Sequence, residues 1–398
     1  MEIDFNKLEV GTVLERNIIG KDGTLVLSKG TKITSENLQR LRNFRSRISY
    51  DGEEPQKSLT VVEEVKETVD ETFRKEIEGN IDEFMSHPTE TQAKKIKEDA
   101  RMIVEKTQRG GEPQFDLEDY LSTKNDTTSH AVRVACFSIL LAQFYNDTVQ
   151  DKDNSALVNL NDIATAALLQ DVGSIYKDPK KLGELTEVPK SKGMEELFPG
   201  IKETPLDYYD ENYSSIYSFS AVAKLDSISN SAKLMILLAG ETEKGDGPLK
   251  MPEVISRKRN GILYGAKIIR VCSIYDDAMK HAIQSDTSLE DVVSEIGQYA
   301  INGDISEEIK ELLINKVKLY PHNTKVLLSN GQVATVEECR VGHYDSYKPV
   351  VRTCGISRKR IDLKESITTT IKSIVSKERF NGILEQQIAH MKDEATGR

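Results

Sequence analysis

The stretch at residues 168–176, LLQDVGSIY, marks the end of an apolar helical pattern. Residues 161–169 carry apolar side chains at the spacing of three and four residues that is typical of a helix. The pattern then meets Gln170, Asp171 and, two residues later, Gly173. Aspartate and glycine favour turns, because the carboxylate accepts backbone N–H groups and glycine adopts conformations that other residues avoid. We therefore predict a helix terminus here, with polar side chains that serve either a site or a turn.

Helical spacing extends on both sides of this stretch, over about residues 115–316. The predicted helices are 127–145, 161–169, 218–239, 261–282 and 288–299, with a long polar loop at 176–212. Their inward faces provide the expected core positions, which include Val134, Ile139, Leu168, Leu169, Ile268, Ile269 and Ile274. The fold class is therefore mainly α, with an all-helical domain at residues 111–320.

Two β-rich segments flank the helical domain. Residues 1–55 read as a small module of short strands, in which Asp22 and Gly23 form a hairpin signal. Strands alternate around Asn330 and Gly331 over about residues 321–365, and a helix from 365 to about 391 follows, so residues 321–398 form a C-terminal β unit with a terminal helix.

Residues 56–110 form a predicted helical connector. Apolar residues from Val62 to Phe84 lie on one face of a helix of about seven turns, and a second helix follows at 90–107. The opposite, charged faces are expected to contact solvent. The alternative is a connector that dimerises or transmits a signal.

Composition excludes several classes of protein. The net charge of -11 over 398 residues disfavours binding to nucleic acid, since the field repels polyanions. The longest apolar run, 134–144, is shorter than the roughly 18 residues that span a bilayer, and no secretory signal is visible, so we expect a cytoplasmic protein without membrane insertion. The four cysteines lack metal-binding spacing and are expected to be reduced.

In their order along the chain, the motifs resemble those of HD-GYP proteins, which are bacterial metal-dependent phosphodiesterases of the HD superfamily that hydrolyse cyclic di-GMP. The matching pieces are LEVGTVLERNI at 8–18, DGTLVLSKGT at 22–31, TTSHAV at 127–132, the stretch at 168–175, 241–248, 270–276 and 321–330. The resemblance covers most of the chain and implies an HD-type helical core. It also implies that an active member holds two or three metal ions through histidine and acidic ligands, so that a bound water attacks phosphorus.

The residues at the matched ligand positions have changed type. His130 matches the first family histidine and Asp171 the bridging aspartate, whereas Gln170 replaces the histidine of the His-Asp pair. Ser174 replaces the lysine that helps to hold phosphate in the family. In the diagnostic GYP segment, Ala239 and Gly240 stand for two histidines, although Glu241 is retained.

The remaining matched positions have also lost the side chains that the family pattern requires. Ser273 stands at the ligand aspartate of the helix that follows, Lys244 replaces another aspartate, and no tyrosine precedes Pro248. Of six histidines, only His130 and His281 fall within the core of the helical domain, and His281 lies about two turns beyond Ser273. Amide, hydroxyl and methyl groups do not replace imidazole and carboxylate as ligands of these metals.

The sequence therefore predicts an HD-GYP-like protein without catalytic residues, cofactor or metal, in which His130, Gln170, Asp171, Glu241 and Ser273 are vestigial motif positions. Such a protein acts as a regulatory or protein-interaction module through a protein partner or self-association, in cyclic di-GMP-related signalling or motility. The alternatives are a residual phosphodiesterase that uses His130, Asp171 and Glu241 around one metal, and a sensor that binds cyclic di-GMP without cleaving it. The loss of the family's basic residues near Lys280 argues against nucleotide binding.

Taken singly, each position also has an ordinary structural interpretation. His130 is then a helix histidine with one hydrogen bond, Asp171 fixes a turn through backbone N–H groups, and the loop at 241–247 is a flexible turn. Tyr208, Tyr209, Tyr213 and Tyr217 pack in the core or loops, although they are also suited to stacking on a guanine base.

Overall fold

The computed structural model describes most of the chain after residue 70. The described ranges are 71–110, 126–149, 154–190, 198–251, 260–285, 287–320, 322–342, 345–355 and 358–396, together with short pieces among residues 11–50. The chain divides into a unit at 1–64 and a unit at 65–398. Most of the predicted N-terminal module, the start of the connector, Pro321 and His343 lie outside the described residues, and the domain boundaries given above stay predictions.

The first unit contains three described strands, β1 (Ile18–Gly20), β2 (Leu25–Leu27) and β3 (Ile48–Tyr50). They form an antiparallel sheet in the order β2-β1-β3. The pairing of β1 with β2 agrees with the hairpin expected around residues 22–23.

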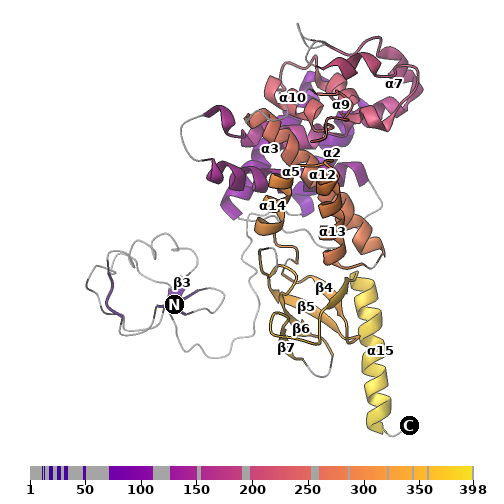
Figure 1. The fold of residues 1–398 in the computed structure, drawn as a ribbon. Coiled ribbons are helices and arrows are strands. Elements are labelled where there is room, and N and C mark those ends of the chain that lie inside the picture. The colour runs from indigo at the N-terminus through magenta and orange to yellow at the C-terminus, as the bar shows by residue number, and fades with distance from the viewer. Residues whose placement is uncertain are drawn as a thin grey trace. The chain divides into compact units, whose positions relative to one another are not determined.

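The second unit is mainly helical, which confirms the predicted fold class (Figure 1). Its longer helices are α2 (Glu71–Ser86), α3 (Glu90–Gly110), α5 (Asp126–Thr148), α6 (Leu160–Leu169), α9 (Ser214–Val222), α10 (Asn230–Leu238), α12 (Gly261–Ser285), α13 (Leu289–Ile301) and α14 (Glu307–Lys316). Short helical turns fill much of the predicted loop at 176–212, namely η2 (Val172–Lys177), α7 (Pro179–Glu184), η3 (Pro199–Glu203) and η4 (Glu211–Tyr213).

Helix α5 is the central element of the helical core. Between Ala131 and Ala142 every residue is buried, and the helix contacts α2, α3, α6, α12 and α14. The apolar faces of α2 and α3, including Ile77 and Ile103, belong to the same core. A helix that is apolar almost all round must be enclosed by others to bury its side chains, so α5 fixes the positions of the helices around it.

The structure differs from the predicted helix bounds in two places. The predicted helix at 218–239 is interrupted between α9 and α10, where Ser229 begins α10 and its side chain accepts a hydrogen bond from the Ala232 N–H. The predicted helix at 365–391 begins only with α15 (Lys377–Thr396), because Ile371–Ile374 forms strand β8. Local capping chemistry and β-branched residues outweighed the helical spacing in these segments.

The predicted C-terminal β unit is an antiparallel sheet of five strands in the order β7-β6-β5-β4-β8. The strands are β4 (Lys325–Leu328), β5 (Val333–Glu338), β6 (Val350–Thr353), β7 (Arg360–Asp362) and β8. Gly331 has a φ of 82°, a left-handed conformation that suits glycine, in the predicted turn between β4 and β5. Helix α15 packs against β4 and β5.

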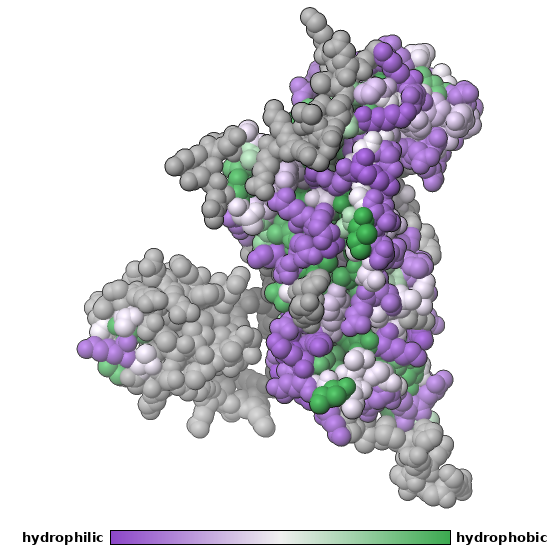
Figure 2. Space-filling model, in the orientation of Figure 1, coloured by the Kyte–Doolittle hydropathy of each residue, from purple (hydrophilic) through white to green (hydrophobic). Residues whose placement is uncertain are grey.

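The surface of the second unit is mixed. The face drawn in Figure 2 is mostly hydrophilic, with hydrophobic residues in small separate groups. Among the described helices, none combines the length and apolar character required to cross a bilayer.

Candidate functional site

The candidate site is centred on His130, at the N-terminal end of α5. Its Nδ1 lies 2.8 Å from Oδ2 of Asp276 on α12, and its Nε2 lies 3.1 Å from Oγ of Ser273 on the same helix. From the end of α6, the Gln170 Nε2 lies 3.4 Å from the His130 Nε2, and a carboxylate oxygen of Asp171 lies 3.5 Å from that same nitrogen. Of the five motif positions named from the sequence, Gln170, Asp171 and Ser273 therefore surround the imidazole of a fourth, His130.

Arg133 and Asp276 form a buried ion pair beside His130. The Arg133 Nε donates to Asp276 Oδ1 at 2.8 Å, and its Nη2 donates to Oδ2 at 2.9 Å. The Arg133 side chain is 2% exposed and that of Asp276 is fully buried. A planar guanidinium that donates to both oxygens of one carboxylate is the strongest common form of an ion pair, so Asp276 is held in place on both sides.

The surrounding carboxylates keep a proton on His130. Burial alone would lower the pKa of His130, but the hydrogen bond with Asp276 and the charges of Asp171, Asp276 and Asp277 outweigh it and raise the pKa to about 9. Burial would also raise the pKa of Asp276, but the bonds from His130 and Arg133 hold it below its ordinary value. At neutral pH the cations His130 and Arg133 therefore lie against the carboxylates around them, of which Asp276 contacts both.

The residues after α6 are fixed by backbone contacts rather than by the Asp171 side chain. Asp171 precedes η2, but its carboxylate makes no capping hydrogen bond, so the interpretation of Asp171 as a turn-fixing aspartate is wrong. Instead the Ser218 hydroxyl donates to the Gln170 carbonyl at 2.5 Å and accepts the Gly173 N–H at 2.9 Å. The Asp171 carboxylate is thereby left to face His130.

Gly173 allows η2 to approach α9 closely, and its substitution tests this packing. A Cβ at position 173 would lie 2.5 Å from the Ser218 backbone nitrogen and 2.8 Å from the Ser214 carbonyl oxygen. We expect Gly173→Ala to lower the free energy of unfolding by about 1–3 kcal/mol, because the backbone must shift. Chemical denaturation measures the change.

The matched control is Gly183→Ala in α7, where no atom lies within 4 Å of the added Cβ. Its expected effect is less than about 1 kcal/mol, since alanine is the better helix former. An equal loss of stability in both variants would show that the contact of η2 with α9 is not what requires glycine.

Glu241, the fifth motif position, makes its contacts elsewhere. Its carboxylate accepts the Leu249 N–H at 2.7 Å and the Met251 N–H at 3.4 Å. Burial raises its pKa, and the two backbone N–H groups partly oppose that rise. Glu241 thus anchors the loop that matches the GYP segment, and the loop is also tied by Lys244 to Asp304 at 2.7 Å. These contacts correct the expectation of a flexible turn.

The positions that correspond to the family's paired histidines lack room for an imidazole at Gly240. A Cβ there would lie 2.3 Å from Oγ of Ser215 and 3.2 Å from Cγ of Pro248. Arg270 of α12 covers the adjoining end of α10, where Nη1 lies 3.4 Å from the Ala239 carbonyl oxygen and 3.2 Å from that of Gly240. The end of α10 is therefore packed closed.

A cluster of tyrosines lies beside Asp171. Tyr209 stacks on Tyr217 with ring centroids 5.0 Å apart, and Tyr176 contacts Tyr217 at 5.9 Å. Burial, aided by the charges of Glu211 and Asp171, raises the pKa of Tyr209 to about 12. Tyr209 and Tyr217 are thus packed against one another, as expected, while Tyr208 is 58% exposed.

The donors around His130 do not fit a centre of two or three metal ions. Within the described residues, His130, Asp276 and Asp277 form a group whose ligand atoms lie within 4.8 Å of one another. However, both Asp276 oxygens already accept hydrogen bonds from Arg133, and the His130 Nδ1 lies 2.8 Å from Asp276 Oδ2. Asp277 is 70% exposed at the edge of this group. Gln170 and Ser273 contribute neither imidazole nor carboxylate.

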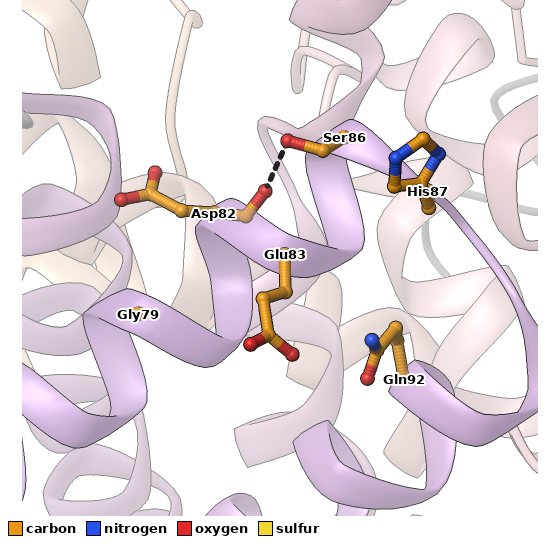
Figure 3. Close-up of a pocket in the computed structure, with 6 residues that line it drawn as sticks. All are labelled: Gly79, Asp82, Glu83, Ser86, His87 and Gln92. Atoms are coloured by element: carbon orange, nitrogen blue, oxygen red, sulfur yellow. Dashed lines mark hydrogen bonds between the residues drawn. The ribbon is translucent and has the colours of Figure 1, made fainter.

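A pocket of about 400 Å³ lies at the turn between α2 and α3, away from the His130 cluster (Figure 3). It is lined by Asp82, Glu83, His87 and Gln92, among others. The side chains of Asp82, Glu83 and His87 point in different directions, and Glu83 is paired with Lys95 at 2.8 Å. Since the polar groups do not converge, this pocket provides no chemistry comparable to the His130 cluster.

No motif in the sequence points to Arg133 and Asp276, which form a buried ion pair in the site. A signal was present, because Arg133 interrupts an apolar run of α5 three residues after His130, and a buried arginine requires a partner. The identity of that partner, 143 positions along the chain, required the fold.

No family model and no curated protein matches the chain. Among solved structures, the chain matches "Bd1817, a HDG"Y"P protein from Bdellovibrio bacteriovorus", at 16% sequence identity and a TM-score of 0.41. The match covers 79% of this chain and 97% of that chain.

Proposed function

We propose that this chain is a catalytically inactive HD-GYP-like protein that acts as a regulatory or protein-interaction module in cyclic di-GMP-related signalling. The observation that carries the proposal is that Gln170 and Ser273, which offer neither imidazole nor carboxylate, lie beside His130 at matched ligand positions. The buried Asp276 next to them is paired with Arg133. His130, Gln170, Asp171 and Ser273 meet as the HD-GYP alignment requires, which supports common ancestry of the site.

Loss of chemistry at this site is supported by its electrostatics. Metal-assisted hydrolysis needs a cation that polarises water and phosphate, and the HD-GYP pattern supplies it through ligands that are here an amide, a hydroxyl, a methyl group and a glycine. The packed contacts of Gly240 and Glu241 further show that the corresponding segments are used for internal packing. A fold can keep its core after its site has lost function, and a role in recognition is then the remaining use.

A hydrolysis assay tests the proposal. The purified chain, supplied with Mn²⁺ or Fe²⁺, is expected to release no pGpG or GMP from cyclic di-GMP above the rate without protein. The Asp171→Ala variant serves as the matched control and is expected to behave as the wild type. Product release that disappears in Asp171→Ala would contradict the proposal and establish a residual phosphodiesterase.

Calorimetry with cyclic di-GMP distinguishes an interaction module from a sensor that binds the dinucleotide without hydrolysing it. We expect no heat of binding at high micromolar ligand, because Tyr209 and Tyr217 are already stacked on each other. Saturable binding without cleavage would replace the proposal with a sensor function.

A further inference from the structure

A pocket of about 450 Å³, lined by both polar and apolar residues, lies in the C-terminal β unit, apart from the helical core. Its lining includes Arg352 and Arg358, His322, Thr335, Cys354 and Leu384. These residues come from β5 and β6, from the segments that flank the strands, and from α15. The volume falls within the range of pockets that hold small molecules.

The pocket lies beside the contact of α15 with the sheet. Val333 of β5 packs against Val375 and Phe380, which join the sheet to α15. Thr335 lies two residues further along β5, on the same face, and pairs in register with Arg352 of β6. Leu384 of α15 also lines the pocket and contributes an apolar side chain to it.

One segment that lines the pocket is basic, while the acidic Glu337 also lines it. Residues 352–360, RTCGISRKR, contain four basic residues and no acidic residue, in a chain of net charge -11. The Arg352 guanidinium pairs with Glu337, and Arg360 pairs with Glu338. Within the described part of the chain, Arg358 has no ion-pair partner, so its charge is left to act on a ligand.

The remaining polar groups extend the donor set. His322 lies with Nδ1 2.8 Å from the Glu337 carbonyl oxygen, to which it donates. This contact orients the imidazole ring at the pocket and leaves Nε2 for another partner. Guanidinium groups match phosphate in charge and in planar geometry.

We propose that this pocket binds a small molecule that carries a phosphate monoester, with the phosphate at Arg358 and the less polar part against Leu384. The site is separate from the His130 cluster and does not depend on the proposed loss of hydrolysis.

Titration calorimetry of the full chain tests this proposal with adenosine 5′-monophosphate as the probe and adenosine as the uncharged comparison. We expect the monophosphate to bind and adenosine not to bind. Arg358→Gln should weaken binding by about tenfold or more, because one charge-assisted contact is lost. Lys359→Gln removes the same charge from the next residue, which does not line the pocket, and should change the affinity less than twofold.

Alkylation of Cys354 locates the bound probe. Labelling by iodoacetamide is measured by peptide mass spectrometry. Adenosine monophosphate should slow the labelling of Cys354, while the labelling of the half-buried Cys339 stays unchanged. Asp171→Ala should bind the probe like the wild type. The proposal is overturned by absence of binding at millimolar probe, by equal losses in the Arg358 and Lys359 variants, or by loss of binding in Asp171→Ala.

Discussion

Arg133→Met is expected to lower the free energy of unfolding by about 3–5 kcal/mol, the cost of removing one partner of a buried ion pair. The Asp276 carboxylate is fully buried and receives two hydrogen bonds from Arg133. Methionine fills part of the volume but donates no hydrogen bond, so the carboxylate would remain buried with His130 as its remaining charged partner. Urea denaturation followed by circular dichroism measures the change.

Two variants make this result specific. Arg101→Met on α3 removes an exposed arginine that pairs with Glu98 and Glu105, and it should cost less than about 1 kcal/mol. The double variant Arg133→Met with Asp276→Leu should regain much of the lost stability, because neither the Arg133 guanidinium nor the Asp276 carboxylate is left without its partner, and Asp171 remains beside His130. A loss below about 1 kcal/mol for Arg133→Met alone would contradict the description of the pair as the centre of the site.

His130 is expected to make the stability of the protein depend on pH in the alkaline range. Its folded pKa of about 9 lies above its ordinary value of 6.5, so the folded state holds the proton more tightly than the unfolded state. The resulting stabilisation is fully present below pH 6.5 and is lost as the pH rises through 9. It amounts to up to about 3 kcal/mol at low pH.

The difference in unfolding free energy between the wild type and His130→Asn, measured from pH 6 to 10, isolates this contribution from other titrating groups. We expect the advantage of the wild type to be largest at pH 6, to shrink as the pH rises above 6.5, and to be lost once the pH has passed 9. NMR titration of the His130 ring provides a second measurement. A midpoint near the ordinary histidine value would mean that the carboxylates around His130 do not hold its proton.

Much of the helical core could be predicted from the sequence, because its side chains follow local periodicity. Ile139, Leu168 and Ile268 are buried as expected. The errors occurred where short-range chemistry differs from periodicity. Ser229 begins a new helix inside the segment predicted as continuous. Ile371–Ile374, which follows the β-branched residues 367–370, forms a strand rather than the start of the terminal helix.

In the candidate site, too, the sequence predicted some of the contacts and not others. The motif order indicated that His130, Gln170, Asp171 and Ser273 belong together, and the structure brings these four side chains into contact range. It does not bring Glu241 to them through any contact of its carboxylate, which is occupied by backbone N–H groups. The pairing of Arg133 with Asp276 depends on how α5 packs on α12, and no local pattern in either helix determines it.

Metal analysis of the purified full chain tests the central claim most directly, namely that the cluster around His130 holds protons and an arginine in place of metal ions. The wild type and the His130→Asn variant would both be purified from cells supplied with iron, manganese, zinc and nickel. Their metal content would then be measured by elemental mass spectrometry. The account predicts far less than one metal per chain in both proteins. Two metals per wild-type chain, lost in His130→Asn, would contradict it.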